Sequence, residues 1–204
     1  MDIIKKLAQE LAIKEEQAKA AVQLIDEGNT IPFIARYRKE MTGALNDETL
    51  RNLHERLLYL RNLEEKKEQV INAITDQGKM TEDLKKKILS AETLVAVDDL
   101  YRPYRPKKQT RATKAKEKGL EPLANILLLQ KTTKSMEEEA AAFVNAEKGV
   151  ANAKEAIAGA KDIIAEMIAD MADYRKSIRN CTMKQGSLVV KAKDEKAESV
   201  YEMY

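Results

Sequence analysis

The chain has 204 residues, with 36 lysines and arginines, 34 aspartates and glutamates, one histidine and one cysteine. Hydrophobic residues make up 44% and charged residues 34%, with only seven glycines and four prolines, which excludes a collagenous, low-complexity or wholly disordered chain. One histidine and one cysteine fall short of the roughly four ligands of a Cys/His zinc site, so no metal is expected. No glycine-rich phosphate loop occurs, so no cofactor is expected either.

The longest uncharged run covers residues 122–130. It is far shorter than the roughly 18 residues that a membrane-spanning helix needs. No secretory leader follows Met1, and the single Cys181 cannot form an internal disulfide. We therefore expect a cytoplasmic protein with no membrane partner.

The first part of the chain has the apolar spacing of short helices. Hydrophobic residues three and four apart predict helices over residues 3–11 and 18–25, the second ended by Gly28. Residues 29–43, NTIPFIARYRKEMTG, form a short mixed segment. This region fits a helix–turn–helix, or alternatively a packed turn that fixes two bundles together.

A long helix is predicted from Asn46 to residue 74, with Gly78 as its stop. About 30 residues at 1.5 Å each make a rod of roughly 45 Å. Its leucine stripe is interrupted over residues 64–68, so we expect part of the rod to lie in solvent. Thr81 is expected to cap the short helix that follows.

Start signals predict four helices after residue 118. These signals are Pro122, Ser135 with Glu138, Asn152 with Glu155, and Asp173. The last three helices are expected over residues 136–144, 153–171 and 174–183. Residues 187–191, SLVVK, predict a short strand near the C-terminus. Because this strand has no partner in the sequence, we expect the chain to be cut at a domain border.

The predicted fold class is all-α, an elongated assembly of small helical bundles with a helix–turn–helix-like part and one long central helix. We expect four parts. Residues 1–45 form the helix–turn–helix-like part, and residues 46–101 the long helix and a helical hairpin. Residues 102–118 form a basic loop and a short helix, and residues 119–204 a C-terminal helical bundle.

Positive charge is concentrated in residues 102–118, which carry a net charge of +7 in a chain whose total is +2. The triplet repeat YRPYRP, residues 101–106, overlaps the start of this segment. It places a proline after each arginine and so favours extended or polyproline geometry. Alternating rings and guanidinium groups suit stacking on bases and pairing with phosphates. The basic strip predicted to contact nucleic acid is Tyr101, Arg102, Tyr104, Arg105, Lys107, Lys108 and Arg111.

This strip has a structural alternative, in which both tyrosines are buried and the arginines pair with Asp98 and Asp99. A second candidate patch for nucleic acid consists of Arg36, Arg38 and Lys39.

The single His54 has no nucleophile motif beside it, and we interpret it as a packing or surface residue. We therefore expect no catalytic residues and no enzyme, with a carboxylate-only site as the remaining enzymatic rival.

Two stretches carry a specific resemblance: residues 28–43, GNTIPFIARYRKEMTG, and residues 98–123, DDLYRPYRPKKQTRATKAKEKGLEPL. Together they resemble the amino-terminal region of the Tex family, the bacterial transcription accessory proteins. Gln109 and Lys114 depart from the basic and apolar residues that are usual in the family.

The resemblance implies a cytoplasmic, RNA-binding, transcription-associated protein whose amino-terminal region is helical. It also implies a layout similar to the eukaryotic Spt-type elongation factor. By the same resemblance, full-length members continue into a ribonuclease-H-like domain, a helix–hairpin–helix region and an OB-type RNA-binding module. We would then expect this chain to stop before the ribonuclease-H-like part.

The expected function is a non-enzymatic scaffold associated with nucleic acid, which binds RNA or DNA weakly on its own. The alternative is a protein-interaction module that docks on RNA polymerase, the ribosome or the protein's own missing domains. The long, partly exposed helix suggests this alternative.

Overall fold

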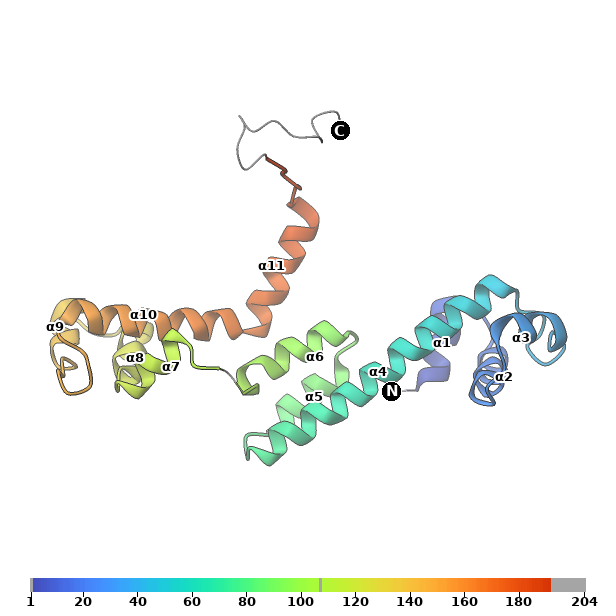
Figure 1. Cartoon of the computed structure of the whole chain (residues 1–204), viewed down its shortest axis with the longest axis horizontal. Helices are drawn as coiled ribbons and strands as arrows, with labels where there is room; N and C mark the ends of the chain where they lie inside the picture. The colour runs from blue at the N-terminus through green and yellow to red at the C-terminus, as the bar shows by residue number, and fades with distance from the viewer. Residues whose placement is uncertain (1, 107, 192–204) are drawn as a thin grey trace, which may run out of the picture.

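The computed structural model describes residues 2–106 and 108–191. In these residues the chain forms eleven α-helices, one short 3-10 helix and no β-sheet, which confirms the all-α fold class. The molecule is elongated: α4 forms a diagonal rod between two groups of short helices, and α11 projects from the body (Figure 1). Within the described residues, no helix has both the length and the apolar character needed to cross a bilayer.

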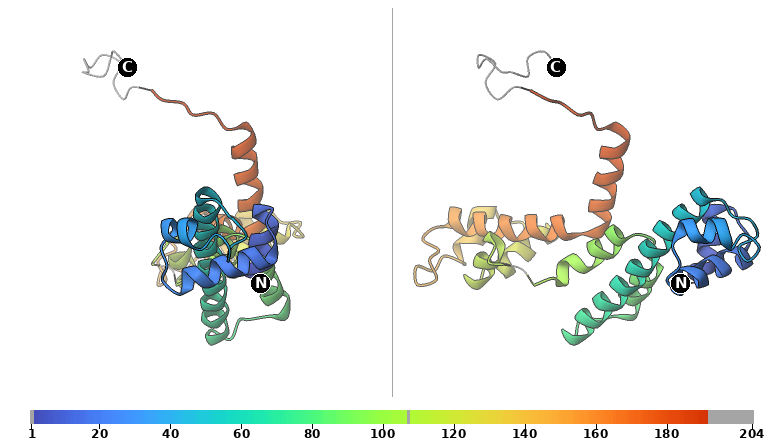
Figure 2. Two further views of the ribbon diagram at one scale, coloured as in Figure 1. Left: turned by 90° about the vertical axis from the view of Figure 1, so that its right-hand side faces the viewer. Right: turned by 45° about the vertical axis from the view of Figure 1, so that its right-hand side comes forward.

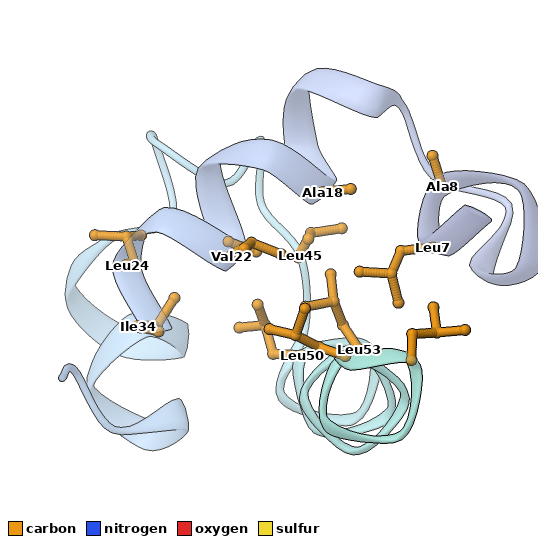
Figure 3. Close-up of a cluster of buried hydrophobic side chains, with 12 residues drawn as sticks. Leu7, Ala8, Ala18, Val22, Leu24, Ile34, Leu45, Leu50 and Leu53 are labelled. Carbon is orange, nitrogen blue, oxygen red and sulfur yellow. The ribbon is translucent and has the colours of Figure 1, made fainter. Parts of the chain in front are cut away.

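The first group consists of α1 (Ile3–Leu11), α2 (Glu15–Asp26) and α3 (Ile31–Tyr37), which pack on the first half of α4 (Asp47–Asp76). The predicted cap Asn46 begins α4 by accepting a hydrogen bond from the Thr49 amide. Leucines of α4 meet apolar side chains of the three short helices in the first core (Figure 3). Burial of this continuous apolar cluster holds the four helices together.

A tight turn joins α2 to α3, as the helix–turn–helix-like prediction requires. Gly28 adopts a φ of +85° in this turn, a conformation that glycine accepts at little cost. The Asn29 side chain closes the turn by donating to the Leu24 carbonyl at 2.9 Å. Pro32 lies in the first turn of α3, so residues 31–37 of the segment predicted as mixed form a short helix, followed by a turn.

The apolar stripe of α4 continues through its second half, so the predicted interruption over residues 64–68 is wrong. Leu63, Val70 and Ile74 are buried, and Lys67 lies between them with only 3% of its surface exposed. The Lys67 ammonium donates to the Leu89 carbonyl at 2.9 Å and to Glu64 at 2.9 Å. A lysine can occupy an apolar position when its stem packs and its charge finds acceptors, so this face of the rod is covered.

The covering helices are α5 (Glu82–Ser90), capped by Thr81 as predicted, and α6 (Leu94–Tyr101). Helix α6 was not predicted as a separate element, although Thr93 caps it by accepting from the Ala96 amide. Together with α4 they form a second core that includes Ile88 and Val97.

The third core lies in the C-terminal part of the chain. It is formed by α7 (Arg111–Glu117), α8 (Glu121–Leu129), α9 (Met136–Ala141) and α10 (Ala153–Asp170). Gly159 lets α10 approach its neighbours, because a Cβ there would lie 3.3 Å from the Cβ of Ala115. The caps predicted at Ser135 and Asn152 are present. However, α9 ends at Ala141 rather than at residue 144.

The last helix, α11 (Ala172–Gln185), turns away from α10 at Met171, where the backbone is extended (Figure 2). It begins two residues earlier than expected and has no side-chain cap, so the predicted Asp173 cap is wrong. None of its residues is buried. Residues 187–191 carry no secondary structure, and the strand stays a prediction because its hydrogen bonds would need a partner strand.

The three cores do not coincide with the four parts predicted from the sequence, and they cross the predicted boundaries in two places. Helix α4 belongs to both the first and the second core, and α7 places Ala112 and Ala115 of the basic segment in the third. The division of the chain at residues 45, 101 and 118 therefore stays a prediction.

Candidate nucleic-acid interface

The basic strip begins as a continuation of α6. Arg102 has helical dihedrals (φ −52°, ψ −43°) and opens a 3-10 turn, Arg102–Tyr104. The extended geometry predicted before each proline is therefore wrong for Arg102. It holds for Arg105, whose φ of −65° and ψ of 132° are extended. The Arg102 amide donates to the Asp98 carbonyl, so the helix continues in spite of the proline that follows.

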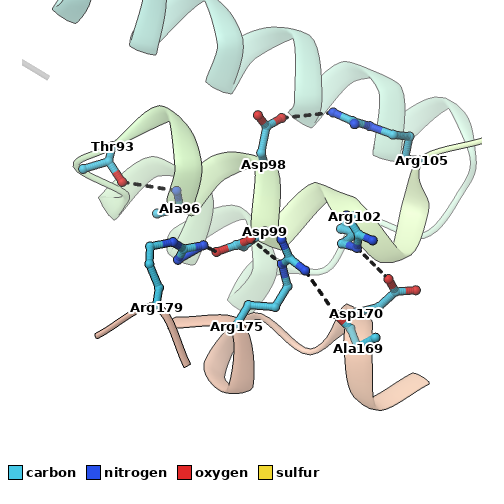
Figure 4. Close-up of polar contacts among 10 residues, drawn as sticks. All are labelled: Thr93, Ala96, Asp98, Asp99, Arg102, Arg105, Ala169, Asp170, Arg175 and Arg179. Atoms are coloured by element: carbon cyan, nitrogen blue, oxygen red, sulfur yellow. Dashed lines mark hydrogen bonds and ion pairs between the residues drawn. The ribbon is translucent and has the colours of Figure 1, made fainter. Parts of the chain in front are cut away.

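Both arginines of the triplet repeat pair with carboxylates, as Figure 4 shows. The Nε of Arg102 donates to Asp170 of α10 at 2.8 Å, and the Asp170 side chain is only 10% exposed. Arg105 donates to Asp98 of α6 at 3.1 Å. The structural alternative placed the arginines on Asp98 and Asp99, and this is correct for Arg105 alone.

The other predicted partner, Asp99, is taken by α11. Arg175 donates to one oxygen of Asp99 at 2.7 Å and Arg179 to the other at 2.5 Å (Figure 4). Sequence reasoning missed both arginines. The signal was their spacing of four residues, which places them on one face of a helix.

The two tyrosines of the strip are half-buried. Tyr101 and Tyr104 pack against the second core, and the Arg105 guanidinium lies 5.6 Å from the centre of the Tyr101 ring. The Tyr104 carbonyl accepts a hydrogen bond from the Gln77 side chain at 3.0 Å. These rings therefore help to attach the strip to the body of the protein, which limits the surface they present to a base.

The rest of the strip is more exposed. The Arg111 side chain is 87% exposed, with its guanidinium 3.6 Å from Asp162. Lys108 is exposed, whereas Lys107 lies outside the described residues. Because an exposed pair at such a distance is weak, Arg111 keeps most of its capacity to meet a phosphate.

Three hollows lie beside the strip, and one of them, of about 270 Å³, is lined by Arg111. A cleft of about 590 Å³ between α5, α6, α10 and α11 is lined by Pro103 and Tyr104 but by no arginine of the strip. A smaller hollow of about 330 Å³ is lined by Arg102, Arg105 and Lys108 together with residues of α10. Three of the strip cations therefore line the 330 Å³ hollow, which makes it more relevant for an anionic ligand than the 590 Å³ cleft.

The second candidate patch lies on α3 and the turn after it, at the end of the molecule opposite α9 and away from the strip (Figure 1). Arg36, Arg38 and Lys39 are exposed, and no ion pair found among residues 2–106 and 108–191 involves them. Tyr37 lies between them with 66% of its surface exposed. We call residues 33–41 the α3 patch.

The turn behind the α3 patch is fixed by hydrogen bonds. The buried Thr42 donates to the Arg38 carbonyl at 3.3 Å. The Gln17 side chain of α2 donates to the carbonyls of Thr42 and Gly43 at 3.2 and 2.9 Å. Three exposed cations and an exposed aromatic ring thus lie at the end of α3 and in a turn that hydrogen bonds hold in place. This combination suits binding to phosphates and bases.

The remaining candidate residues lie on separate helices. His54 is half-buried on α4, and Cys181 is an exposed free thiol on α11. In the described ranges, no three His, Cys, Asp or Glu side chains gather closely enough to hold a metal ion.

Comparisons with known proteins identify two matched regions. Residues 1–75 match the family described as Tex-like protein N-terminal domain, and residues 131–204 match the one described as Tex central region-like.

Individual relatives extend the match over nearly the whole chain. The transcriptional accessory protein Tex of Neisseria gonorrhoeae is 41% identical over 97% of this chain and 26% of its own length. Protein YhgF of Escherichia coli is 47% identical over 90% of this chain and 24% of its length. A human S1 RNA-binding domain-containing protein is 32% identical over 90% of this chain and 18% of its length.

The chain thus spans about a quarter of the length of the bacterial relatives it matches. The two family matches together cover most of its residues, and the two bacterial relatives align with 97% and 90% of it. This chain belongs to the Tex family.

Proposed function

We propose that this chain is a non-enzymatic helical scaffold that helps a Tex-family protein engage RNA or DNA during transcription. Relatives named as a transcriptional accessory protein and as an S1 RNA-binding domain-containing protein support a role with nucleic acid. A cytoplasmic location is part of the same proposal.

The observation that carries the proposal is the contrast between the two cationic surfaces. In the basic strip, Arg102 and Arg105 are engaged by Asp170 and Asp98. In the α3 patch, three exposed cations have no ion-pair partner among the described residues. A cation without an internal partner can neutralise a phosphate without first breaking an ion pair. We therefore assign the main contact to the α3 patch and a secondary contact to Lys108 and Arg111.

A salt titration tests this assignment. Labelled single-stranded RNA and duplex DNA are titrated with the chain at several salt concentrations. The triple variant Arg36→Glu, Arg38→Glu and Lys39→Glu should lose binding, and the salt slope should fall by about 2 if three phosphate contacts are removed. Lys108→Glu with Arg111→Glu should weaken binding less.

A matched control reverses three exposed lysines elsewhere, Lys79, Lys85 and Lys86, at and before α5. It changes the net charge by the same amount but leaves the α3 patch intact. If the patch is the contact surface, the control should bind more tightly than the α3-patch variant. Equal binding by wild type and the α3-patch variant, or equal loss in the control, would remove the proposal.

A protein-docking role is the second candidate, and one observation favours it. Helix α11 and the end of α10 expose apolar side chains, among them Ile168, Met171, Tyr174 and Ile178. The leucine stripe of α4, which suggested docking in the sequence, is covered by other helices. Binding to RNA polymerase or ribosomes that survives charge reversal and is lost on Ile178→Glu would favour docking.

A further inference from the structure

We propose that Tyr37 is a stacking platform for an unpaired base, so that the α3 patch takes single-stranded rather than duplex RNA. This inference rests on the proposed function, because it names the ligand class of the same surface. The basic strip, where the sequence placed base stacking, has its two rings packed against the second core. We therefore assign base stacking to Tyr37 of α3 instead of to the two tyrosines of the strip.

The first step is the position of the ring. Tyr37 is the last residue of α3 and 66% of its surface is exposed, which is unusual for a large aromatic side chain. Phe33, four residues earlier on the same helix, supports it with a centroid distance of 5.3 Å. Because Phe33 contacts Tyr37 from within the patch, the exposed area lies on the side away from Phe33.

The second step is the arrangement of charge around the ring. The Arg38 guanidinium lies 5.2 Å from the centre of the Phe33 ring and donates to the Tyr37 carbonyl at 3.4 Å. Arg36 precedes the ring, Lys39 follows, and Glu40 is the only acid in residues 36–40. A base stacked on Tyr37 would thus lie near three exposed cations that can pair with its neighbouring phosphates.

The turn beside the ring is fixed before any ligand binds. The turn after Tyr37 is held by Thr42 and by the two hydrogen bonds from Gln17, so binding need not order it. A platform that is already in place loses little conformational entropy on binding.

The ligand class follows from which surfaces of a nucleic acid can reach a ring. In a duplex, each base face is covered by its neighbours, and only phosphates and groove edges are open. In a single strand the faces are free, and stacking on aromatic side chains is tolerant of sequence. An exposed ring flanked by cations in the sequence therefore strengthens binding only when the nucleic acid has unpaired bases that can stack on it.

The test uses the full 204-residue chain and two fluorescent probes of equal length, a uridine RNA oligonucleotide and an abasic oligonucleotide with the same phosphates. Tyr37→Ala should weaken uridine binding by about tenfold and leave abasic binding unchanged. Tyr37→Phe keeps the ring and should bind like wild type. Tyr174→Ala removes an exposed tyrosine of α11 and serves as the matched control.

Each other result is decisive. If Tyr37→Ala weakens both probes equally, or weakens a duplex RNA as much as the single strand, the ring acts structurally and this inference is wrong. If Tyr37→Ala has no effect while charge reversal of the α3 patch abolishes binding, the inference fails and the proposed function stands. If charge reversal has no effect either, the proposed function fails as well.

Discussion

Asp99 of α6 and Arg175 of α11 form a hydrogen-bonded ion pair at 2.7 Å although 76 residues separate them in the sequence. The pair joins parts of the chain whose hydrophobic clusters share no residue. Arg102 and Asp170 cross the same junction with the charges reversed, the arginine now in the earlier part. These ion pairs thus connect α6 and Arg102, which follows it, to α10 and α11.

The first prediction concerns this junction. Asp99→Ala leaves Arg175 and Arg179 without their shared acceptor, and we expect α11 to detach. The cost should be about 2 kcal/mol, below that of a fully buried pair, because both arginines keep part of their surface in water. Amide hydrogen exchange in α11 should accelerate by about thirtyfold.

Asp98→Asn is the control for this prediction, because its pairs with Arg105 and Lys66 are more exposed. It should change exchange in α11 little. Unchanged exchange in Asp99→Ala would show that α11 is held by other contacts.

The second prediction compares two leucines that are neighbours on α4. Leu57 is fully buried in the first core, whereas Leu58 is 48% exposed. Leu57→Ala should lower the free energy of unfolding by about 2–5 kcal/mol, through lost apolar burial and the cavity left behind. Leu58→Ala should cost less than about 1 kcal/mol. Urea unfolding followed by circular dichroism measures both, and similar losses would contradict the assigned core.

The third prediction tests the turn behind the α3 patch. Gly43 has a φ of +59°, and a Cβ there would lie 2.7 Å from the Gln17 Nε2 that holds the turn. Gly28 has a φ of +85° but open space around it. Gly28→Ala should therefore cost about 1 kcal/mol from backbone strain alone, and Gly43→Ala visibly more.

If the turn positions the α3 patch, Gly43→Ala should also weaken RNA binding, while Gly28→Ala should not. Thermal unfolding and the oligonucleotide titration measure the two effects separately. Equal stability of the two variants would mean that Gln17 moves aside without cost.

The fourth prediction concerns pH. Arg56 of α4 donates to both carboxylate oxygens of Glu10 at 2.6 and 2.9 Å, and these hydrogen bonds lower the pKa of Glu10. A carboxyl with a lowered folded-state pKa stabilises the fold above its unfolded pKa, and this contribution is lost as pH falls through the folded pKa.

Glu10→Gln should therefore cost at most about 1 kcal/mol near neutral pH and less below about pH 4. Unfolding free energies at the two pH values measure the difference. The Asp26–Arg61 pair, in which Arg61 lowers the pKa of Asp26 by hydrogen bonding, offers an independent repeat with Asp26→Asn. A penalty that grows in acid would contradict the assigned pair.

Much of the helical layout was predictable because its signals are local. Asn46, Thr81, Ser135 and Asn152 each accept from an amide three residues later, so a cap is visible within four consecutive residues. The two long motifs were likewise sufficient to indicate the family, which the comparisons confirm.

The candidate site was less predictable, because it depends on which charges find partners. Nothing near Arg102 in the sequence reveals Asp170, which lies 68 residues away. Lys67 interrupts the apolar stripe in the sequence, yet it is buried because α5 brings the Leu89 carbonyl within reach.

The sequence by itself determined the fold class and most helix starts, since short-range hydrogen bonds and periodic burial set them, and its two long motifs indicated the family. Only the tertiary structure decided which cations are engaged. It holds Arg102 and Arg105 on carboxylates and leaves the α3 patch exposed, because an ion pair forms between groups that folding brings together, whatever their distance along the chain.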